Sequence, residues 1–313
     1  MLKVKSIRWI FVLLPILLAL PFLTPYHSLA SEMLIFAIFA LGYDILFGYA
    51  GVLSFGHAMF FGVGAYTTGL VLTRWVPSLF VGISLGMVLG VFLALIVAFL
   101  SIRRRGIYFV MVTLAFCQMF YFIAFKWVSL TGGDNGLHGV PRPQLGPIDL
   151  NSELNLYYFI LALFVSSVLL AFRIIHSPFG RVLEALRENE DRAMSVGYNT
   201  NRFKIIAFMI SAFFAALAGG LYAIHSNFVP LNTLSIFTSG DVVIMALVGG
   251  IGTLFGPVFG AMLIVYLKNL LSAWMKNWNL IMGLIFISCV LVFRKGILLG
   301  LKDKFIHKGK TGG

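Results

Sequence analysis

Three ionisable side chains lie deepest inside the otherwise apolar stretches of the sequence, where a charge is costly. They are Asp44, Asp241 and Lys268. If these stretches cross a membrane, each such residue is by default a candidate for a solute path or a proton relay. Lys268 also fits a structural role, because its long side chain can reach the membrane surface. Asp44 and Asp241 each precede a glycine-rich break, and for them a functional and a structural role both stay open.

Two glycine-rich breaks interrupt the apolar stretches and resemble each other. The first spans residues 48–57 (GYAGVLSFGH) and the second spans residues 249–257 (GGIGTLFGP). Dense glycines let helices approach closely or unwind, and unwound backbone inside a membrane is tolerated only beside protein or a water-filled path. Paired broken segments therefore point to a transport path. The predicted path residues are Asp44, Gly48, Gly51, Ser54, Gly56, His57, Asp241, Gly249, Gly252 and Gly256.

No arrangement of side chains in the sequence indicates catalysis. Gly309, Lys310 and Thr311 match the end of a phosphate-binding loop signature, but the glycine required five residues earlier is Lys304. Neither an HExxH pair nor a GxSxG elbow is present, the six histidines are scattered, and the two cysteines lie inside apolar stretches. We therefore expect no catalytic residue, no cofactor or nucleotide site and no metal site in this chain.

Composition places the chain among membrane proteins. Hydrophobic residues make up 60% of the 313 residues, charged residues make up 11%, and the mean hydropathy is +0.99. Because one crossing needs about 20 apolar residues, the sequence predicts an all-α, polytopic transmembrane bundle of about ten spans, within a range of eight to ten. Residues 1–313 are expected to form a single domain with glycine-broken segments. The predicted spans are 8–24, 31–47, 58–71, 79–102, 106–128, 155–174, 204–224, 238–249, 257–273 and 278–293.

The first of these spans has an alternative interpretation. Residues 8–24 follow a basic lead and precede small residues, which also fits a cleaved signal peptide. We prefer a retained span, because the apolar run is long for a signal core. If residues 8–24 were cleaved off, an odd number of crossings would remain. That number conflicts with a cytoplasmic position for the basic clusters later in the chain.

The placement of the formal net charge of +12 predicts the orientation in the membrane. Basic residues cluster near the N-terminus, at residues 103–105, in a polar island from His176 to Lys204, and in the tail 296–313. Basic loops favour the cytoplasmic side, so both termini are expected in the cytoplasm, and the bilayer rather than nucleic acid explains the charge. The polar segment 130–154 is then an extracytoplasmic loop, either a plain connector or a docking site. Its candidate docking residues are Asp134, Asn135, His138 and Arg142.

The island from His176 to Lys204, within the loop 175–204, has the punctuation of one or two short helices. Ser177 suits an N-cap, Pro178 suits the first helical position, and Gly197 suits a helix stop. An apolar ridge recurs at near-helical spacing between charged residues, made of Phe179, Val182, Leu183, Leu186, Ala193 and Val196. Such a ridge packs on its own membrane domain or in a groove of a partner. A solvated loop with a lid helix is the third possibility.

Four motifs, taken in sequence order, resemble one known family. They are residues 48–66 (GYAGVLSFGHAMFFGVGAY), 105–115 (RGIYFVMVTLA), 131–136 (TGGDNG) and 180–190 (GRVLEALRENE). Together they resemble the M-type (LivM-like) permeases of branched-chain amino acid ABC importers, over about residues 30–295. The resemblance implies a permease subunit of the cell inner membrane that is not itself an enzyme.

The resemblance also implies a role for the island and a set of partners. The island would be a cytoplasmic coupling loop that docks a separate ATPase. Asp191 and Gly197 keep the spacing of that family loop, whereas Arg192 departs from its usual small residue and a closing Leu-Pro is missing. The implied coupling residues are Phe179, Leu183, Glu184, Leu186, Glu188, Asp191 and Gly197. The implied partners are a related second permease, two ATP-binding subunits that hold ATP and Mg, and an extracytoplasmic solute-binding protein.

The expected function is the ATP-driven import of branched-chain amino acids by alternating access. A urea or short-amide importer is the first alternative, because such permeases share these motifs. A proton-coupled carrier that uses Asp44 or Asp241, and a membrane scaffold without a solute, are more distant alternatives. The island favours an importer, because neither a carrier nor a scaffold needs a docking helix. The sequence leaves the solute and the pairing of the permeases open.

Overall fold

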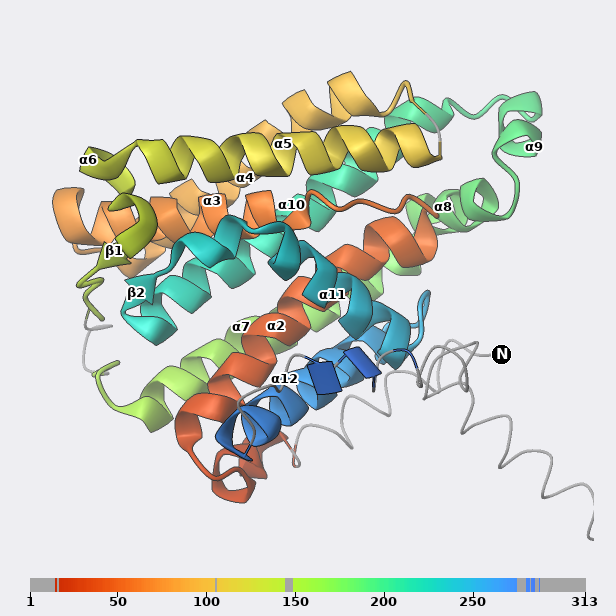
Figure 1. The fold of residues 1–313 in the computed structure, drawn as a ribbon. Coiled ribbons are helices and arrows are strands. Elements are labelled where there is room, and N and C mark those ends of the chain that lie inside the picture. The colour runs from red at the N-terminus through yellow and green to blue at the C-terminus, as the bar shows by residue number, and fades with distance from the viewer. Residues whose placement is uncertain are drawn as a thin grey trace, which may run out of the picture.

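The computed structural model describes residues 17–104, 106–143 and 149–274, together with residues 15, 280, 281, 283, 284 and 287. Over these residues the chain forms a helical bundle (Figure 1). A two-stranded antiparallel ribbon of β1 (Leu137–His138) and β2 (Phe228–Val229) lies at one end. The short helices α8 (Pro178–Glu188) and α9 (Glu190–Ser195) lie at the opposite end.

Helix α2 (His27–Asp44) is the centre of the bundle and continues into one π-helical turn, η1 (Ile45–Tyr49). Apolar residues surround its whole circumference, and a helix of that kind is stable only when it is buried on all sides. Accordingly, almost every residue from Leu29 to Asp44 is buried. The helices packed around it are α7 (Glu153–Ile175), α10 (Thr200–Ser226), α11 (Ile236–Gly249) and α12 (Gly256–Trp274).

Helix α3 (His57–Leu70), followed by η2 (Val71–Trp75), packs closely on α4 (Leu79–Ser101) and on α10. Glycines make this approach possible. A Cβ atom on Gly64 would overlap the backbone of Ala216, and one on Gly219 would overlap the backbone of Phe61. In a membrane such close backbone contact stabilises helix pairs through van der Waals packing.

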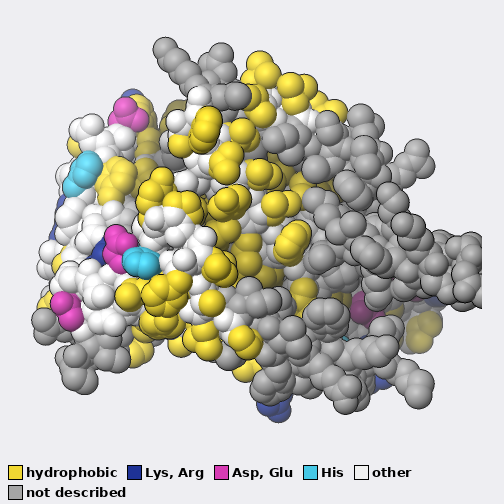
Figure 2. All heavy atoms as spheres, turned by 90° about the horizontal axis from the view of Figure 1, so that it is seen from below, with side chains coloured by type: hydrophobic (Ala, Val, Ile, Leu, Met, Phe, Trp, Pro, Cys, Tyr) yellow, Lys and Arg dark blue, Asp and Glu magenta, His cyan; other side chains and the backbone are white. Residues whose placement is uncertain are grey.

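The outer helices present apolar side chains to the surroundings. Helix α5 (Ile107–Lys126) is the least buried of the long apolar helices, and exposed residues such as Met111 and Phe122 cover its outer side. Figure 2 shows a belt of hydrophobic side chains across the middle of another face, with charged and histidine side chains toward the end that carries β1 and β2. Such a surface suits the hydrocarbon of a bilayer.

Two helical segments, α3 with η2 and α11, are not among the described helices that are long and apolar enough to cross a membrane. Helix α11 has 14 residues, which corresponds to about 21 Å of helix against a hydrocarbon core of about 30 Å. Helix α3 with η2 covers residues 57–75 and is longer. Irregular, non-helical backbone at residues 51–56 precedes α3, and β2 with the 3-10 turn η4 (Leu231–Leu234) precedes α11. The two N-terminal ends meet, because the backbone N–H of Ala58 donates a hydrogen bond to Ser239 Oγ over 2.9 Å.

The predicted count of about ten spans is not confirmed. Among the described residues, six helices are long and apolar enough to cross a membrane: α2 with η1, α4, α5, α7, α10 and α12. Helices α3 and α11, at the predicted spans 58–71 and 238–249, are not among them. Residues 17–23 of the predicted span 8–24 are helical, whereas most of the span 278–293 and the whole tail 296–313 lie outside the described residues.

The predicted outer loop 130–154 is partly ordered into short elements. It begins in helix α6 (Val128–Thr131) and continues through the 3-10 turn η3 (Gly133–Asn135) into β1. Pairing of β1 with β2 ties this loop to the segment that follows α10. The loop is therefore anchored to the bundle at its first half.

Candidate functional site

The two glycine-rich breaks meet at the end of the bundle that carries α8. The backbone N–H of Gly252 donates a hydrogen bond to Asp44 Oδ1 over 2.9 Å. Arg187, which belongs to α8, donates from Nη1 to the carbonyl oxygen of Gly48. These two bonds join residues that are 208 and 139 positions apart in the sequence. We call Asp44, Gly48, Gly51, Arg187 and Gly252 the glycine junction.

The backbone of the glycine junction requires glycine. Gly51 and Gly252 have φ angles of +71° and +74°, which residues with a Cβ atom rarely adopt. A Cβ on Gly48 would overlap the carboxylate of Asp44. A Cβ on Gly252 would overlap the guanidinium of Arg187, and one on Gly51 would lie 3.3 Å from Arg187 Cα. Arg187 therefore occupies the space that the missing side chains leave.

Asp44 depends on the protein for the stabilisation of its carboxylate, since only 2% of the residue is exposed. The N–H of Gly252 supplies one donor, and the guanidinium of Arg187 acts on the carboxylate electrostatically. The second oxygen, Oδ2, has no hydrogen-bond partner among the described residues. The sequence predicted Asp44 beside the solute path, and the structure places it in a buried link between the two breaks.

The other polar path residues of the first break are packed in the core. Ser54 and His57 are fully buried, and Ser54 Oγ accepts a hydrogen bond from the N–H of Gly56 over 3.2 Å. The hydroxyl of Ser211 donates to the carbonyl oxygen of Gly42 over 2.6 Å, so it accepts from His57 Nε2 at 2.6 Å. These bonds hold the re-entrant segment in place. In this conformation Ser54, Gly56 and His57 do not line an open path.

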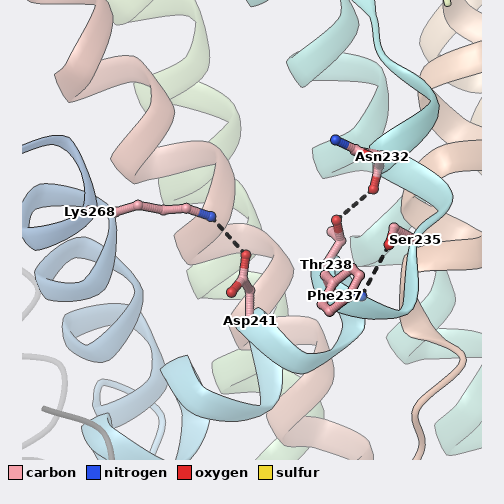
Figure 3. A network of polar contacts seen from close by, with 6 residues as sticks. All are labelled: Asn232, Ser235, Phe237, Thr238, Asp241 and Lys268. Carbon is pink, nitrogen blue, oxygen red and sulfur yellow. Dashed lines mark hydrogen bonds and ion pairs between the residues drawn. The ribbon is translucent and has the colours of Figure 1, made fainter. Parts of the chain in front are cut away.

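The path residues predicted at and before the second break lie in two separate places. A Cβ on Gly249 would overlap the backbone of Gly256, so α11 and α12 are joined by a tight connection. Asp241 lies elsewhere, because eight residues of helix, about 12 Å, separate it from Gly249. Its carboxylate pairs with Lys268 of α12 at 2.9 Å (Figure 3). The predicted path residues thus separate into the glycine junction, a packed core group, the tight connection of Gly249 with Gly256, and Asp241 in an ion pair.

Helix α8 begins as the sequence predicts and turns its apolar ridge inward. Ser177 Oγ accepts a hydrogen bond from the N–H of Gly180 over 3.4 Å, with Pro178 at the first helical position. Leu183 and Leu186 are 1% and 4% exposed and face the bundle, where α8 packs on α7, α10 and η1. This corrects the prediction that these two leucines contact an ATPase. The chain's own helices already cover the ridge of this amphipathic helix.

The outward side of the loop 175–204 carries the charged residues for which the resemblance implies a coupling role. Glu184, Glu188 and Asp191 are exposed. Phe179 is half-buried and stacks on Phe203 with a centroid distance of 5.7 Å. Lys204 pairs with Glu190 at 2.6 Å, which fastens α9 to the start of α10. The loop is therefore a fixed surface with charge on its outer side.

A small apolar surface follows the charged residues. Met194, Val196 and Tyr198 are 42%, 73% and 43% exposed. We call these three residues the α9 patch. Gly197 lies between them with a φ angle of +98°, so a side chain there would strain the turn. The apolar ridge predicted from the sequence includes Val196 but neither Met194 nor Tyr198.

The predicted docking residues of the outer loop lie at the opposite end of the bundle, near β1 and β2. Asp134, Asn135 and His138 are exposed. The ring of His138 stacks on Phe228 across the β1–β2 pair, with a centroid distance of 4.4 Å. This end therefore offers an ordered polar surface.

Arg142 has a different environment from the other docking candidates. Its Nε donates to the carbonyl oxygen of Ile224 over 3.1 Å, and its Nη2 donates to that of His225 over 2.5 Å. Partial burial lowers the pKa of the guanidinium, and the charge of Glu153 counteracts this effect. Arg142 therefore caps the last carbonyl groups of α10. The structure gives it a structural role and does not support a docking role for it.

A family model described as branched-chain amino acid transport system / permease component matches residues 26–293. This chain belongs to that permease family. The match covers α2 to α12, and with them both glycine breaks and the coupling loop. The resemblance that the four motifs indicated is thereby confirmed.

Individual relatives of this permease agree with the family match. It is 28% identical to the high-affinity branched-chain amino acid transport system permease protein LivM of Salmonella typhimurium, over 94% of this chain and 75% of the relative. The protein of the same name from Escherichia coli K12 is 27% identical over the same shares. The autoinducer 2 import system permease protein LsrC of Salmonella paratyphi B is 30% identical over 67% of this chain and 60% of the relative. No solved structure matches the chain significantly.

The family match establishes the broad role of the chain. It is a permease component of a transport system, and its relatives are transport permeases rather than enzymes. Its apolar helices are compatible with a protein that crosses the membrane several times.

Some residues that position the candidate site were not predicted from the sequence. Arg187 was noted only as a charged flank of the island, although its place four residues after Leu183 sets it at the edge of the buried side of α8. The helix caps Asn189 and Asn199 were also missed, and their side-chain oxygens accept hydrogen bonds from the first turns of α9 and α10. An asparagine just before a charged helical turn was the available signal.

Proposed function

We propose that this permease is the membrane-spanning subunit of an ATP-driven importer for branched-chain amino acids. The observation that carries the proposal is the contact of α8 with both glycine breaks through Arg187. Broken segments are where transporters rearrange. A movement of α8 would therefore reach the core of the permease directly. The names of the two LivM relatives support branched-chain amino acids as the solute class.

The ATPase subunits would dock on the outward side of the coupling loop. That side combines the acidic residues Glu184, Glu188 and Asp191 with the exposed α9 patch. An apolar centre with a polar rim is the usual anatomy of a protein interface. ATP and Mg would be held by these partners, because the permease sequence has no phosphate-binding loop.

The transport cycle follows from this docking. Closure of the ATPase pair on ATP would displace α8, and Arg187 would shift the carbonyl of Gly48 relative to Gly252. The path would then face the other side of the membrane, as one of two pre-existing conformations gains population. A related second permease would complete the path, because the outer sides of several helices remain exposed in this chain.

The proposed orientation places both termini and the coupling loop in the cytoplasm. The loop 130–154 is then outside the cell inner membrane. There, a solute-binding protein would dock on the surface formed by Asp134, Asn135 and His138. The opposite positions of β1 with β2 and of α8 with α9 in Figure 1 fit two separate docking surfaces.

A urea or short-amide importer remains the alternative, with the same mechanism and a different solute. The LsrC relatives add autoinducer 2 to the solutes named among related permeases. A proton-coupled carrier is disfavoured by a specific observation. Asp44 accepts a hydrogen bond from Gly252, and Asp241 is paired with Lys268, so both candidate proton carriers are engaged.

The test replaces Met194 and Val196 of the α9 patch with Asp. Two charges in a desolvated contact typically cost several kcal/mol, so we expect ATPase copurification to fall at least about tenfold. Leucine uptake by vesicles reconstituted with all subunits should be lost. The abundance of the permease should stay normal, because both side chains are exposed.

The matched control is Arg202→Asp, which changes the net charge by the same amount at an exposed position outside the α9 patch. It should retain the ATPase and transport leucine. Equal ATPase retention by the double variant and the control would contradict docking at the α9 patch. Uptake of urea without uptake of leucine by the unaltered assembly would assign the alternative solute.

A further inference from the structure

An ion pair lies on the outer side of the bundle in the C-terminal part of the described chain. Lys268 Nζ of α12 donates to Asp241 Oδ2 of α11 at 2.9 Å, and the two side chains are 38% and 34% exposed. Figure 3 shows the lysine reaching across from α12 to the carboxylate. Both charges are therefore accessible to a small molecule.

The pair lies near the middle of a membrane crossing. Lys268 follows Gly256, the first residue of α12, by 12 positions, which is about 18 Å of helix. Asp241 precedes Gly249, the last residue of α11, by eight positions, which is about 12 Å. With a hydrocarbon core of about 30 Å, both charges are close to its midplane. Charged side chains at that depth face a water-filled cavity or protein rather than lipid.

The backbone beside the pair supports the same conclusion. Residues 230–235 include the turn η4 and are not α-helical. Such backbone at membrane depth occurs only where it is buried or lines a cavity. Asn232 of this segment is exposed, and its carbonyl oxygen accepts a hydrogen bond from Thr238 Oγ1 over 2.7 Å (Figure 3). A carboxylate, an ammonium group, a carboxamide and irregular backbone thus share one region of the molecule.

We propose that Asp241 and Lys268 form a binding site for zwitterionic amino acids on the solute path. Asp241 accepts the α-ammonium group of the solute, and Lys268 donates to its α-carboxylate. In the empty site the two residues pair with each other, and the carboxyl group of Glu32 on α2 also acts on Lys268 electrostatically. An α-amino acid brings both charges, so its binding replaces each partner with a group of the same sign and leaves neither Asp241 nor Lys268 unpaired. The flexible stem of Lys268 lets its ammonium group move away from Asp241 and open the site.

This inference rests on the proposed function, because it assigns the solute site of the same importer. It also explains how the permease discriminates among solutes. Urea and other neutral molecules lack the two opposite charges that compensate the opening of the ion pair. The site therefore favours amino acids over the solutes of the alternative importer.

The first experiment replaces the pair with apolar residues of similar size, Asp241→Leu with Lys268→Met, in the complete assembly. An ion pair with only a structural role tolerates such a replacement. We expect normal abundance, normal ATPase copurification and normal ATP hydrolysis in the absence of solute. Binding of radiolabelled leucine to the assembly in nanodiscs without the solute-binding protein should fall at least about tenfold, and leucine uptake should fall with it. The control Asp241→Glu with Lys268→Arg keeps both charges and should keep binding.

A second measurement uses only the unaltered assembly. Leucinamide lacks the carboxylate and 4-methylpentanoate lacks the ammonium group, so each should compete with leucine at least about tenfold more weakly than unlabelled leucine does. Leucine binding by the apolar double variant within twofold of the unaltered assembly, or competition by either analogue as strong as that of unlabelled leucine, would overturn the inference. The proposed function would fail differently, through absence of a copurifying ATPase or of leucine uptake in the unaltered assembly.

Discussion

Replacing Arg187 with Met tests whether α8 holds the glycine breaks through one side chain. The change removes the donor to the carbonyl of Gly48 and the cation that acts on Asp44. Loss of a charged hydrogen bond and of compensation for a buried carboxylate costs about 2–4 kcal/mol. Leu183 and Leu186 stay buried under α8, and each contributes about 1.5–3 kcal/mol through burial. The helix should therefore remain attached while its link to the breaks is lost.

The assay compares Arg187→Met with Arg181→Met, an exposed arginine of the same helix. A shift of about 2 kcal/mol, the lower end of the expected cost, changes the population of the linked state roughly 30-fold. We expect Arg187→Met to reduce leucine uptake by a similar factor and to make ATP hydrolysis independent of solute, at normal membrane abundance. Arg181→Met should behave like the unaltered permease.

A double-variant cycle with Asp44→Asn measures the link itself. Because the neutral amide no longer needs the cation, the two changes should couple by about 1–3 kcal/mol in the free energy of unfolding, followed by chemical denaturation in micelles. Additive effects, or normal uptake and normal solute dependence in Arg187→Met, would refute the reasoning that Arg187 joins the coupling helix to the breaks.

Three further predictions use simpler measurements. A cysteine at Asn189 should react with an impermeant thiol reagent only from the cytoplasmic side and one at Asn135 only from outside, and labelling of both from one side would contradict the orientation. Gly252→Val should reduce uptake without preventing assembly, because valine does not tolerate a φ angle of +74°; normal uptake would show that the second break is a mere connector. Leu183→Asp with Leu186→Asp should lower the abundance of the permease, because two charges would enter the interface of α8 with the bundle; normal abundance in immunoblots of membranes would place the ridge outside that interface.

The sequence predicted those parts of the structure that depend on local signals. The apolar runs correspond to the long helices, and the Ser177 and Pro178 pair begins α8 where expected. The two breaks that resemble each other lie close together, because Gly252 of the second break bonds to Asp44, just before the first break; their role in a transport path stays a prediction. In each case the information lies in residue type and short-range spacing, which a single sequence contains.

Other parts depend on tertiary contacts that local patterns do not contain. The ridge of α8 fitted its own bundle and a partner groove equally well, and only the packing of Leu183 and Leu186 decided between them. Asp241 and Lys268 were recognised singly, but their 27-residue separation across two helices gave no sign that they pair. Arg187 reaches a backbone carbonyl, an acceptor that every residue offers, so no sequence pattern marks Gly48 as its partner.

The segments that precede α3 and α11 also determine how a rearrangement of the permease responds to temperature. Hydroxyl groups of Ser54 and Ser239 bond to the backbone there. The apolar side chains of Leu53, Phe55 and Leu234 pack on the core. The heat-capacity change of a transition grows with the apolar surface that it exposes. A rearrangement that withdraws these segments from the core exposes such surface. Its equilibrium therefore follows a curve rather than a straight line as the temperature changes.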